Sequence, residues 1–154
     1  MTPARLALCA VAEGDFEAMA ALRIEAMRES LERLGRFDPE RARERLRAGF
    51  ETTFMHHIVL DRGERIGFVT LRPEGRDALR LDHLYIRPMH QGQGIGAWIM
   101  DWIQSRARAT GIAVKVTVLK RSDAHRFYER HGFKPEGEDT WDLHYRWLPS
   151  GGTL

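Results

Sequence analysis

The sequence contains a single cysteine, Cys9, in a chain of 154 residues. One thiol cannot form an internal disulfide, and it cannot supply the paired cysteines of a structural zinc site. The histidines are scattered, and the adjacent His56 and His57 would project to opposite faces of a strand. We therefore expect no metal site, and we expect the protein to work in a reducing compartment, the cytoplasm.

Long apolar runs are also absent. No stretch of 18 apolar residues, about the length of a membrane-spanning helix, occurs anywhere in the chain. The N-terminus, MTPARLALCAVAEGD, has too few consecutive apolar residues for a signal peptide. These features predict a soluble, cytoplasmic protein that has no membrane partner.

The chain also lacks a dense run of basic residues. Its net charge is +2 and its pI is near 9.0, but the positive charge is spread along the chain. Acidic and basic side chains are interleaved in one stretch, at Glu32, Arg33, Arg36, Glu40, Arg41, Arg43, Glu44, Arg45 and Arg47. Such interleaving is typical of a solvated helix face rather than of a DNA-binding surface. We expect no nucleic-acid partner.

The length indicates one domain. A chain of 154 residues can bury one substantial core and seldom supports two, and no repeat or linker divides this one. We therefore expect a single domain over residues 1–154. The oligomeric state stays open at this stage, with a homodimer among the assemblies considered.

A glycine-rich turn is the most informative feature that is present. The segment LDHLYIRPMHQGQGIG leads from a strand over 78–86, through Gly92, Gly94 and Gly96, into a helix over 95–110. Glycines let backbone N–H groups approach an anion, and the positive end of the helix dipole points to the same place. The spacing is not the G-x-G-x-x-G of dinucleotide-binding folds, so the turn predicts a pyrophosphate site of another kind.

A second segment, VTVLKRSDAHRFYERHGF, places a strand before a short helix that carries Phe127 and Tyr128. This segment and the motif Gln91-x-x-Gly94-x-Gly96 together resemble the signature of the GNAT acyltransferases, over about residues 79–147. The matching positions in the second segment are Val118, Leu119, Lys120, Ala124, Phe127, Tyr128, Gly132 and Phe133. Two positions differ from the common pattern, because Ser122 stands where the family often has Asn and Gln91 where Arg is frequent.

The resemblance implies an N-acetyltransferase that binds acetyl-CoA and transfers its acetyl group to a primary amine. The acceptor stays open at this stage: a small amine, an amino acid, a peptide N-terminus or a protein lysine. It implies direct transfer in a ternary complex, since Cys9 lies far from the motif along the sequence. The residues expected to bind coenzyme A are Leu84, Tyr85, Ile86, Gln91, Gly92, Gln93, Gly94, Ile95, Gly96, Ser122, Phe127 and Tyr128. A non-catalytic acyl-CoA-binding or sensor protein of the same fold is the alternative.

Acyl transfer to an amine needs a base, a group that stabilises the oxyanion and a proton donor for the thiolate. The resemblance implies that Tyr128 donates the proton and that the backbone N–H of Leu84 binds the oxyanion. Asp82 and His83 are the candidate bases, on opposite faces of a strand unless a bulge re-aims one, and Asp82 is favoured. In the structural alternatives, Tyr128 is a core aromatic residue and Asp82 pairs with an arginine.

The remaining pattern predicts the order of elements. A strand over 6–11 precedes a helix capped by Asp15 and a second helix over 39–48, capped by Asp38. Strands over 57–60 and 65–71 and a turn over 72–75 come before the glycine motif; a strand over 112–118 follows its helix. The apolar face expected for the first helix comprises Phe16, Ala20, Ile24, Met27, Leu31 and Leu34.

The chain closes with one or two strands, in which Trp141, Leu143, Tyr145 and Trp147 alternate. The resulting fold class is α+β, an α/β three-layer sandwich. Its GNAT-like sheet is mixed and mostly antiparallel, with helices on both faces.

Overall fold

The computed structural model describes residues 5–149. Its strands form one mixed sheet in the order β1-β2-β3-β4-β5-β7-β6. Within the described range, the chain forms two compact units: residues 5–70 with 83–96, and residues 71–82 with 97–149. Strands β3 and β4 and helix α3 each contribute to both units. The α+β sandwich with a mixed sheet, predicted from the order of elements, is confirmed.

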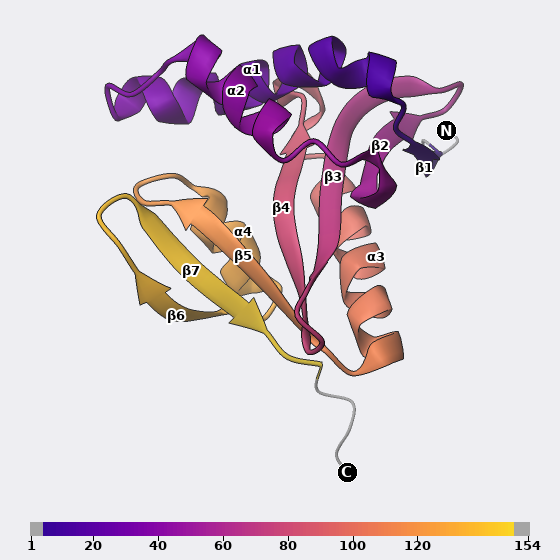
Figure 1. Ribbon diagram of the computed structural model, residues 1–154, viewed down its shortest axis with the longest axis vertical. Coiled ribbons are helices and arrows are strands. Elements are labelled where there is room, and N and C mark those ends of the chain that lie inside the picture. The colour runs from indigo at the N-terminus through magenta and orange to yellow at the C-terminus, as the bar shows by residue number, and fades with distance from the viewer. Residues whose placement is uncertain (1–4, 150–154) are drawn as a thin grey trace. The chain divides into compact units, whose positions relative to one another are not determined.

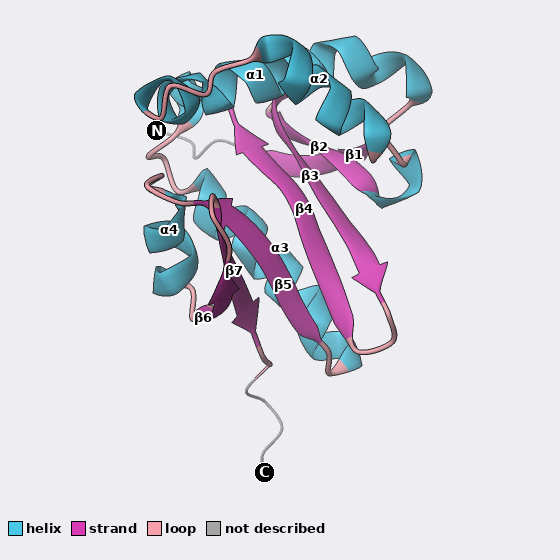
Figure 2. Ribbon diagram, turned by 60° about the vertical axis from the view of Figure 1, so that its left-hand side comes forward, coloured by secondary structure: helices cyan, strands magenta, loops and turns pink. Residues whose placement is uncertain are grey.

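The first unit contains the N-terminal elements. They are β1 (Leu6–Ala10), α1 (Phe16–Arg33), α2 (Pro39–Ala48), β2 (Met55–Leu60), the first part of β3 (Glu64–Glu74) and the last part of β4 (Ala78–Ile86). Strand β2 pairs in antiparallel register with β1 on one side and with β3 on the other. Helices α1 and α2 lie side by side (Figures 1 and 2).

The core of this unit is built from both helices and two strands. Its fully buried members include Phe16, Met19, Leu46, Met55 and Phe68. The apolar face expected for the first helix is buried at Phe16 and Ala20, whereas Ile24, Met27, Leu31 and Leu34 are only partly buried.

Arg23 is buried on α1 instead. Its guanidinium donates to the carbonyl oxygen of Ala42 on α2 and, over 3.2 Å, to the hydroxyl of Tyr85 on β4. These hydrogen bonds offset the cost of burying a charge. The 3.6-residue pattern could not reveal them, because the partners come from other elements.

The two aspartates predicted to cap helices behave differently. Asp38 accepts a hydrogen bond from the backbone N–H of Arg41 and caps α2, which begins at Pro39 as expected. Asp15 stands at the N-cap position of α1 but makes no side-chain cap bond to it. Its carboxylate instead accepts from the N–H of Ala12 and from the buried ring of His57, at 2.8 and 2.9 Å.

The Asp15 carboxylate therefore joins the start of α1 to β2. The hydrogen bond from His57, followed by that from Ala12, lowers the pKa of Asp15 to about 2. Because the folded-state pKa lies below the ordinary value of about 3.9, this carboxylate stabilises the fold above pH 4. That stabilisation disappears as the pH falls from about 4 to about 2.

We expect Asp15→Asn to lower the free energy of unfolding by about 1–2 kcal/mol at pH 7. The difference between wild type and variant should shrink toward zero between pH 4 and pH 2. Urea titrations across this range measure it, with Glu13→Gln as the control, since Glu13 is an exposed carboxylate on the same turn. A stability difference that stays constant down to pH 2 contradicts the assignment.

Gly67 on β3 lies against the backbone of β4. A Cβ atom at this position would lie 2.2 Å from the carbonyl oxygen of Tyr85 and 3.2 Å from the Cα of Ile86. The N–H of Arg87 also donates to the carbonyl of Ile66 over 2.8 Å, so the two backbones are held close together. Gly67 thereby fixes the position of the last part of β4, whose residues 84–86 are expected to bind coenzyme A.

We expect Gly67→Ala to destabilise the protein by about 3 kcal/mol or more, because the added methyl group meets backbone rather than a flexible side chain. Gly49→Ala is the matched control, since a Cβ at Gly49 meets nothing within 4 Å. Chemical denaturation of both variants gives the comparison. Equal stability of the two variants would refute the close approach.

The second unit contains the remaining elements. They are the end of β3, the start of β4, most of α3 (Ile95–Thr110), β5 (Ala113–Leu119), α4 (Ala124–Arg130), β6 (Lys134–Glu138) and β7 (Asp142–Trp147). Strand β5 is parallel to β4 and antiparallel to β7, which also pairs with β6. Figure 2 shows α4 beside β5, the strand that it follows.

Strand β5 has one apolar and one polar face. Val114, Val116 and Val118 are buried on one face of β5, whereas Lys115 is half-buried and Thr117 exposed on the other. Trp141, which the sequence placed on a strand, precedes β7 and is 49% exposed.

The turn expected at 72–75 lies further along the chain. Strand β3 continues to Glu74, and Gly75 with a φ of +66° begins the turn. The extension occurs because Arg72 and Glu74 pair across the hairpin with side chains of β4.

Candidate active site

The glycine loop follows β4 in the first unit. A short 3-10 turn (Pro88–His90) leads into residues 91–94, which are all exposed, and α3 begins at the buried Ile95. Gly92 and Gly94 have φ values of +77° and +83°, and a Cβ at either position would meet nothing within 4 Å. The loop therefore presents open backbone at the start of a 16-residue helix. Such an arrangement suits an anion.

The two glutamines of this loop turn back onto it. The side-chain amide of Gln91 donates to the carbonyl of Ile86 over 2.9 Å, and that of Gln93 donates to the carbonyl of Met89 over 3.4 Å. These contacts hold the shape of the loop. Contacts to a phosphate would thus come mainly from backbone N–H groups, including those that lead into Gly96.

The last part of β4 carries the residues expected to contact the pantetheine arm and the acyl group. The parallel register with β5 ends at Leu81↔Val116, so Leu84 and Ile86 lie beyond it along the strand. The ring of Tyr85 packs against that of Phe68, with centroids 5.5 Å apart, and His83 lies 6.1 Å from the same ring. The side chain of Tyr85 thus packs against Phe68 and accepts the hydrogen bond from Arg23, so a contact of this residue with the cofactor would come from its backbone.

Tyr128 belongs to the second unit. It is 6% exposed on α4, and its ring makes edge contacts with Phe127 and Phe133 at centroid distances of 5.1 and 5.3 Å. Burial among aromatic rings fixes the ring in place, and its phenol can still act as a proton donor. The packing of the Tyr128 ring is therefore compatible with a role of its hydroxyl as a proton donor.

Ser122 is buried at the turn between β5 and α4. Its hydroxyl donates to the carbonyl of Leu119 over 2.7 Å, and its own carbonyl accepts from the ring of His125 over 2.7 Å. The hydroxyl proton is therefore used within the turn, and a cofactor contact would have to donate to one of the two lone pairs of the oxygen. Asp123 is the N-cap residue of α4, without a side-chain cap bond.

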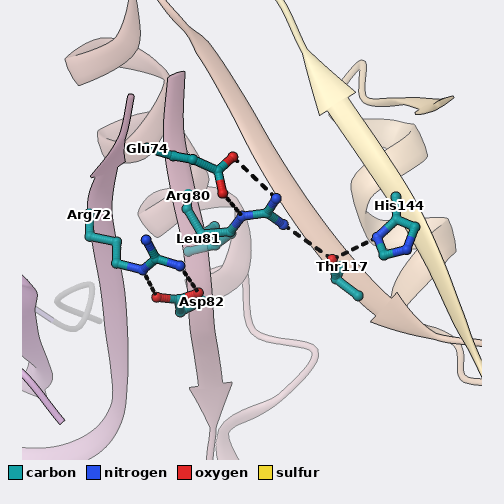
Figure 3. A pocket seen from close by; sticks show the side chains of 7 residues that line it. All are labelled: Arg72, Glu74, Arg80, Leu81, Asp82, Thr117 and His144. Carbon is teal, nitrogen blue, oxygen red and sulfur yellow. Dashed lines mark hydrogen bonds and ion pairs between the residues drawn. The ribbon is translucent and has the colours of Figure 1, made fainter. Parts of the chain in front are cut away.

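Asp82, the favoured base, forms a bidentate ion pair with Arg72 on β3. The hydrogen bond to Asp82 raises the pKa of the Arg72 guanidinium. The pair belongs to a polar cavity of about 330 Å³ in the second unit, shown in Figure 3. The cavity is lined by Arg72, Glu74, Arg80, Leu81, Asp82, Thr117 and His144.

A second ion pair and a histidine complete this cavity (Figure 3). Arg80 holds both oxygens of Glu74, at 3.1 and 3.2 Å, and lowers the pKa of that carboxyl. Arg80 also donates to the hydroxyl of Thr117, which lies 2.9 Å from Nδ1 of His144. The sequence analysis did not single out Thr117 and His144. Both are polar residues that alternate with apolar ones along β5 and β7, and this alternation could have placed them on the polar face.

Two features that residues 5–149 lack bear on the type of site. No group of three or more His, Cys, Asp and Glu side chains in this range is placed to hold a metal ion. Within the same residues, no helix is both long and apolar enough to span a bilayer.

Comparison with known sequences identifies the family. Residues 53–135, more than half of the chain, match the acetyltransferase (GNAT) domain. The chain therefore belongs to the GNAT acetyltransferase family, whose general chemistry is acyl transfer. The resemblance carried by the glycine loop and by the segment around Tyr128 is confirmed.

A curated relative and several solved structures are similar to this chain. The aminoalkylphosphonate N-acetyltransferase of Salmonella typhimurium is 31% identical over 86 residues, which cover 51% of this chain and 56% of that protein. The chain thus matches just over half the length of this relative.

The paiA N-acetyltransferase of Thermoplasma acidophilum, solved with coenzyme A, superposes with a TM-score of 0.76 at 17% identity, over 94% of this chain and 99% of that one. A GCN5-related N-acetyltransferase from Rhodopseudomonas palustris gives 0.72 at 18% identity, over 96% and 98%. At these identities, the likeness shows the fold.

Proposed function

We propose that the protein is an N-acetyltransferase that transfers an acetyl group from acetyl-CoA to a primary amine by direct transfer. The glycine loop carries the proposal. Its backbone is open at Gly92 and Gly94, it precedes a long helix, and it lies inside the region that matches the GNAT domain. Acetyl-CoA, when bound, supplies an acyl group activated as a thioester. We propose that residues 1–154 form the single domain that carries out this acetyl transfer.

Residues of the chain have separate proposed roles. The N–H groups of residues 91–96 bind the pyrophosphate, and the backbone of Leu84 and Ile86 pairs with the pantetheine amides as an added strand would. The N–H of Leu84 donates to the acyl oxygen as it gains charge. The Tyr128 hydroxyl protonates the leaving sulfur. We further propose that the protein acts in the cytoplasm.

A small amine that also carries an acidic group is the proposed acceptor class. The similarity to an aminoalkylphosphonate N-acetyltransferase supports it.

Thiol release tests the function. Purified protein is mixed with acetyl-CoA and, in turn, aminomethylphosphonate, 2-aminoethylphosphonate, β-alanine, ethanolamine or a lysine-containing peptide. We expect amine-dependent release of coenzyme A thiol, fastest with the first three compounds. A stabilising thermal shift with acetyl-CoA but no turnover with any amine would instead support the non-catalytic alternative.

A further inference from the structure

A chain of hydrogen bonds crosses β4, β5 and β7 on the polar face of the second unit. It begins at Nη1 of Arg80, which donates to Oγ1 of Thr117 over 3.2 Å. Oγ1 of Thr117 lies 2.9 Å from Nδ1 of His144, its partner in the antiparallel register. Nε2 of His144 lies 3.2 Å from Oδ2 of Asp139, in the segment before β7.

The carboxylate at the end of this chain is fixed. Backbone N–H groups of Asp142 and Trp141 donate to its Oδ1, at 2.9 and 3.1 Å, so Oδ2 is held toward His144. The same backbone bonds, with a smaller contribution from the histidine, lower the pKa of Asp139. Asp139 is therefore an anion that orients the imidazole.

The directions of the hydrogen bonds determine which atoms carry protons. The Asp139 carboxylate can only accept, so neutral His144 carries its proton on Nε2 and donates it to Asp139. Nδ1 of His144 is then an acceptor, so Thr117, which accepts from Arg80, donates its single proton to Nδ1. One lone pair of Thr117 Oγ1 remains, on an exposed residue that lines the cavity of Figure 3.

The other charges that line the cavity are paired with one another. Arg72 binds Asp82 and Arg80 binds Glu74, which leaves the hydroxyl and the imidazole as the neutral polar groups of the cavity. Lys115 and Arg146 form a register pair two residues along β5 and β7, the next pair on the same face. Asp139 is the carboxylate in contact with the ring of His144.

We propose that Thr117, His144 and Asp139 form the proton-accepting relay for the amine acceptor. This inference rests on the proposed acetyltransferase function. The amine gives its proton to Oγ1 of Thr117 while the hydroxyl proton of Thr117 passes to Nδ1 of His144. The nitrogen keeps the electron pair that forms the bond to the acyl carbon, and the bond from that carbon to sulfur breaks with its electrons on sulfur. Asp139 stabilises the imidazolium, and the 36% exposed His144 side chain returns the proton to solvent.

Four variants test the relay. Their kcat is measured with the amine that the wild-type protein acetylates fastest among those given under Proposed function. We expect Thr117→Val, which keeps the shape and removes the hydroxyl, to lower kcat by about 100-fold, whereas Thr117→Ser should stay within about threefold. His144→Gln should lower kcat by about 100-fold or more, because the acceptor of the Thr117 proton is lost. Arg146→Gln, on the same face of β7, is the control with unchanged kcat.

A second measurement does not depend on turnover. The ring nitrogen NMR shifts of His144 should place the proton on Nε2 in wild type and divide it between the two ring nitrogens in Asp139→Ala, because the carboxylate that accepts from Nε2 is gone. The same nitrogen shifts in both proteins overturn the role of Asp139.

Full activity in Thr117→Val or in His144→Gln overturns the relay while the proposed function stands. Should wild type release no thiol with any amine of the panel, the proposed function fails, and the relay fails with it.

Discussion

Replacing Tyr128 with phenylalanine is expected to lower kcat by about 10- to 1000-fold while leaving the affinity for acetyl-CoA nearly unchanged. The substitution removes one hydroxyl from a ring held by Phe127 and Phe133. The aromatic packing should therefore survive, and the loss should fall on protonation of the leaving sulfur. Steady-state kinetics together with calorimetric titration of acetyl-CoA separate the two quantities.

Tyr145→Phe is the matched control. Tyr145 is also buried in the second unit, and its hydroxyl donates to Glu129 over 2.7 Å. Burial, followed by this hydrogen bond, raises the pKa of Tyr145 to about 12. Losing that hydroxyl should cost about 1–3 kcal/mol of stability and leave kcat unchanged. If both variants keep wild-type kcat, Tyr128 is a packing residue.

Gly94→Asp should weaken binding of coenzyme A by about 100-fold or more. It places a side chain and a negative charge where two charge-assisted hydrogen bonds to phosphate, each contributing about 1.5–3 kcal/mol, are expected. Calorimetric titration measures the dissociation constant. Gly94→Asn, which adds similar bulk without charge, should lose less affinity.

Gly111→Asp provides a control for the backbone conformation. Gly111 has a φ of +70°, close to the +83° of Gly94, and lies after the last residue of α3. The strain of an aspartate at positive φ is therefore matched, and coenzyme A should bind normally. Undiminished binding by a folded Gly94→Asp protein would place the pyrophosphate elsewhere.

Local patterns predicted several elements at their observed bounds. Strand β4 over Ala78–Ile86 and helix α3 over Ile95–Thr110 match the sequence prediction, and β5 differs from it by one residue at each end. These elements have strong local signals, since Gly111 adopts the positive φ that ends α3 and apolar residues alternate along β5. The glycine loop was likewise visible, because its requirement is a backbone conformation that few other residues adopt.

Other features depended on partners that are distant in sequence. Arg72 and Glu74 extend β3 because Asp82 and Arg80 face them across the hairpin. The Asp15 carboxylate does not cap α1 as expected; it accepts a hydrogen bond from His57, which lies 42 residues away in the sequence. Secondary-structure propensity and hydrophobic periodicity depend on a residue and its near neighbours in the sequence. Neither could therefore predict the length of β3 or the partner of Asp15.

The sequence was enough to identify the family, the order of the elements and the glycine loop, because spacing along the chain encodes local backbone geometry. The pairing of Asp82 with Arg72, and that of Thr117 with His144, 27 residues later, became visible only in the folded chain. Cross-strand register makes these contacts. The packing of both faces of the sheet sets that register, and no short stretch of sequence records it.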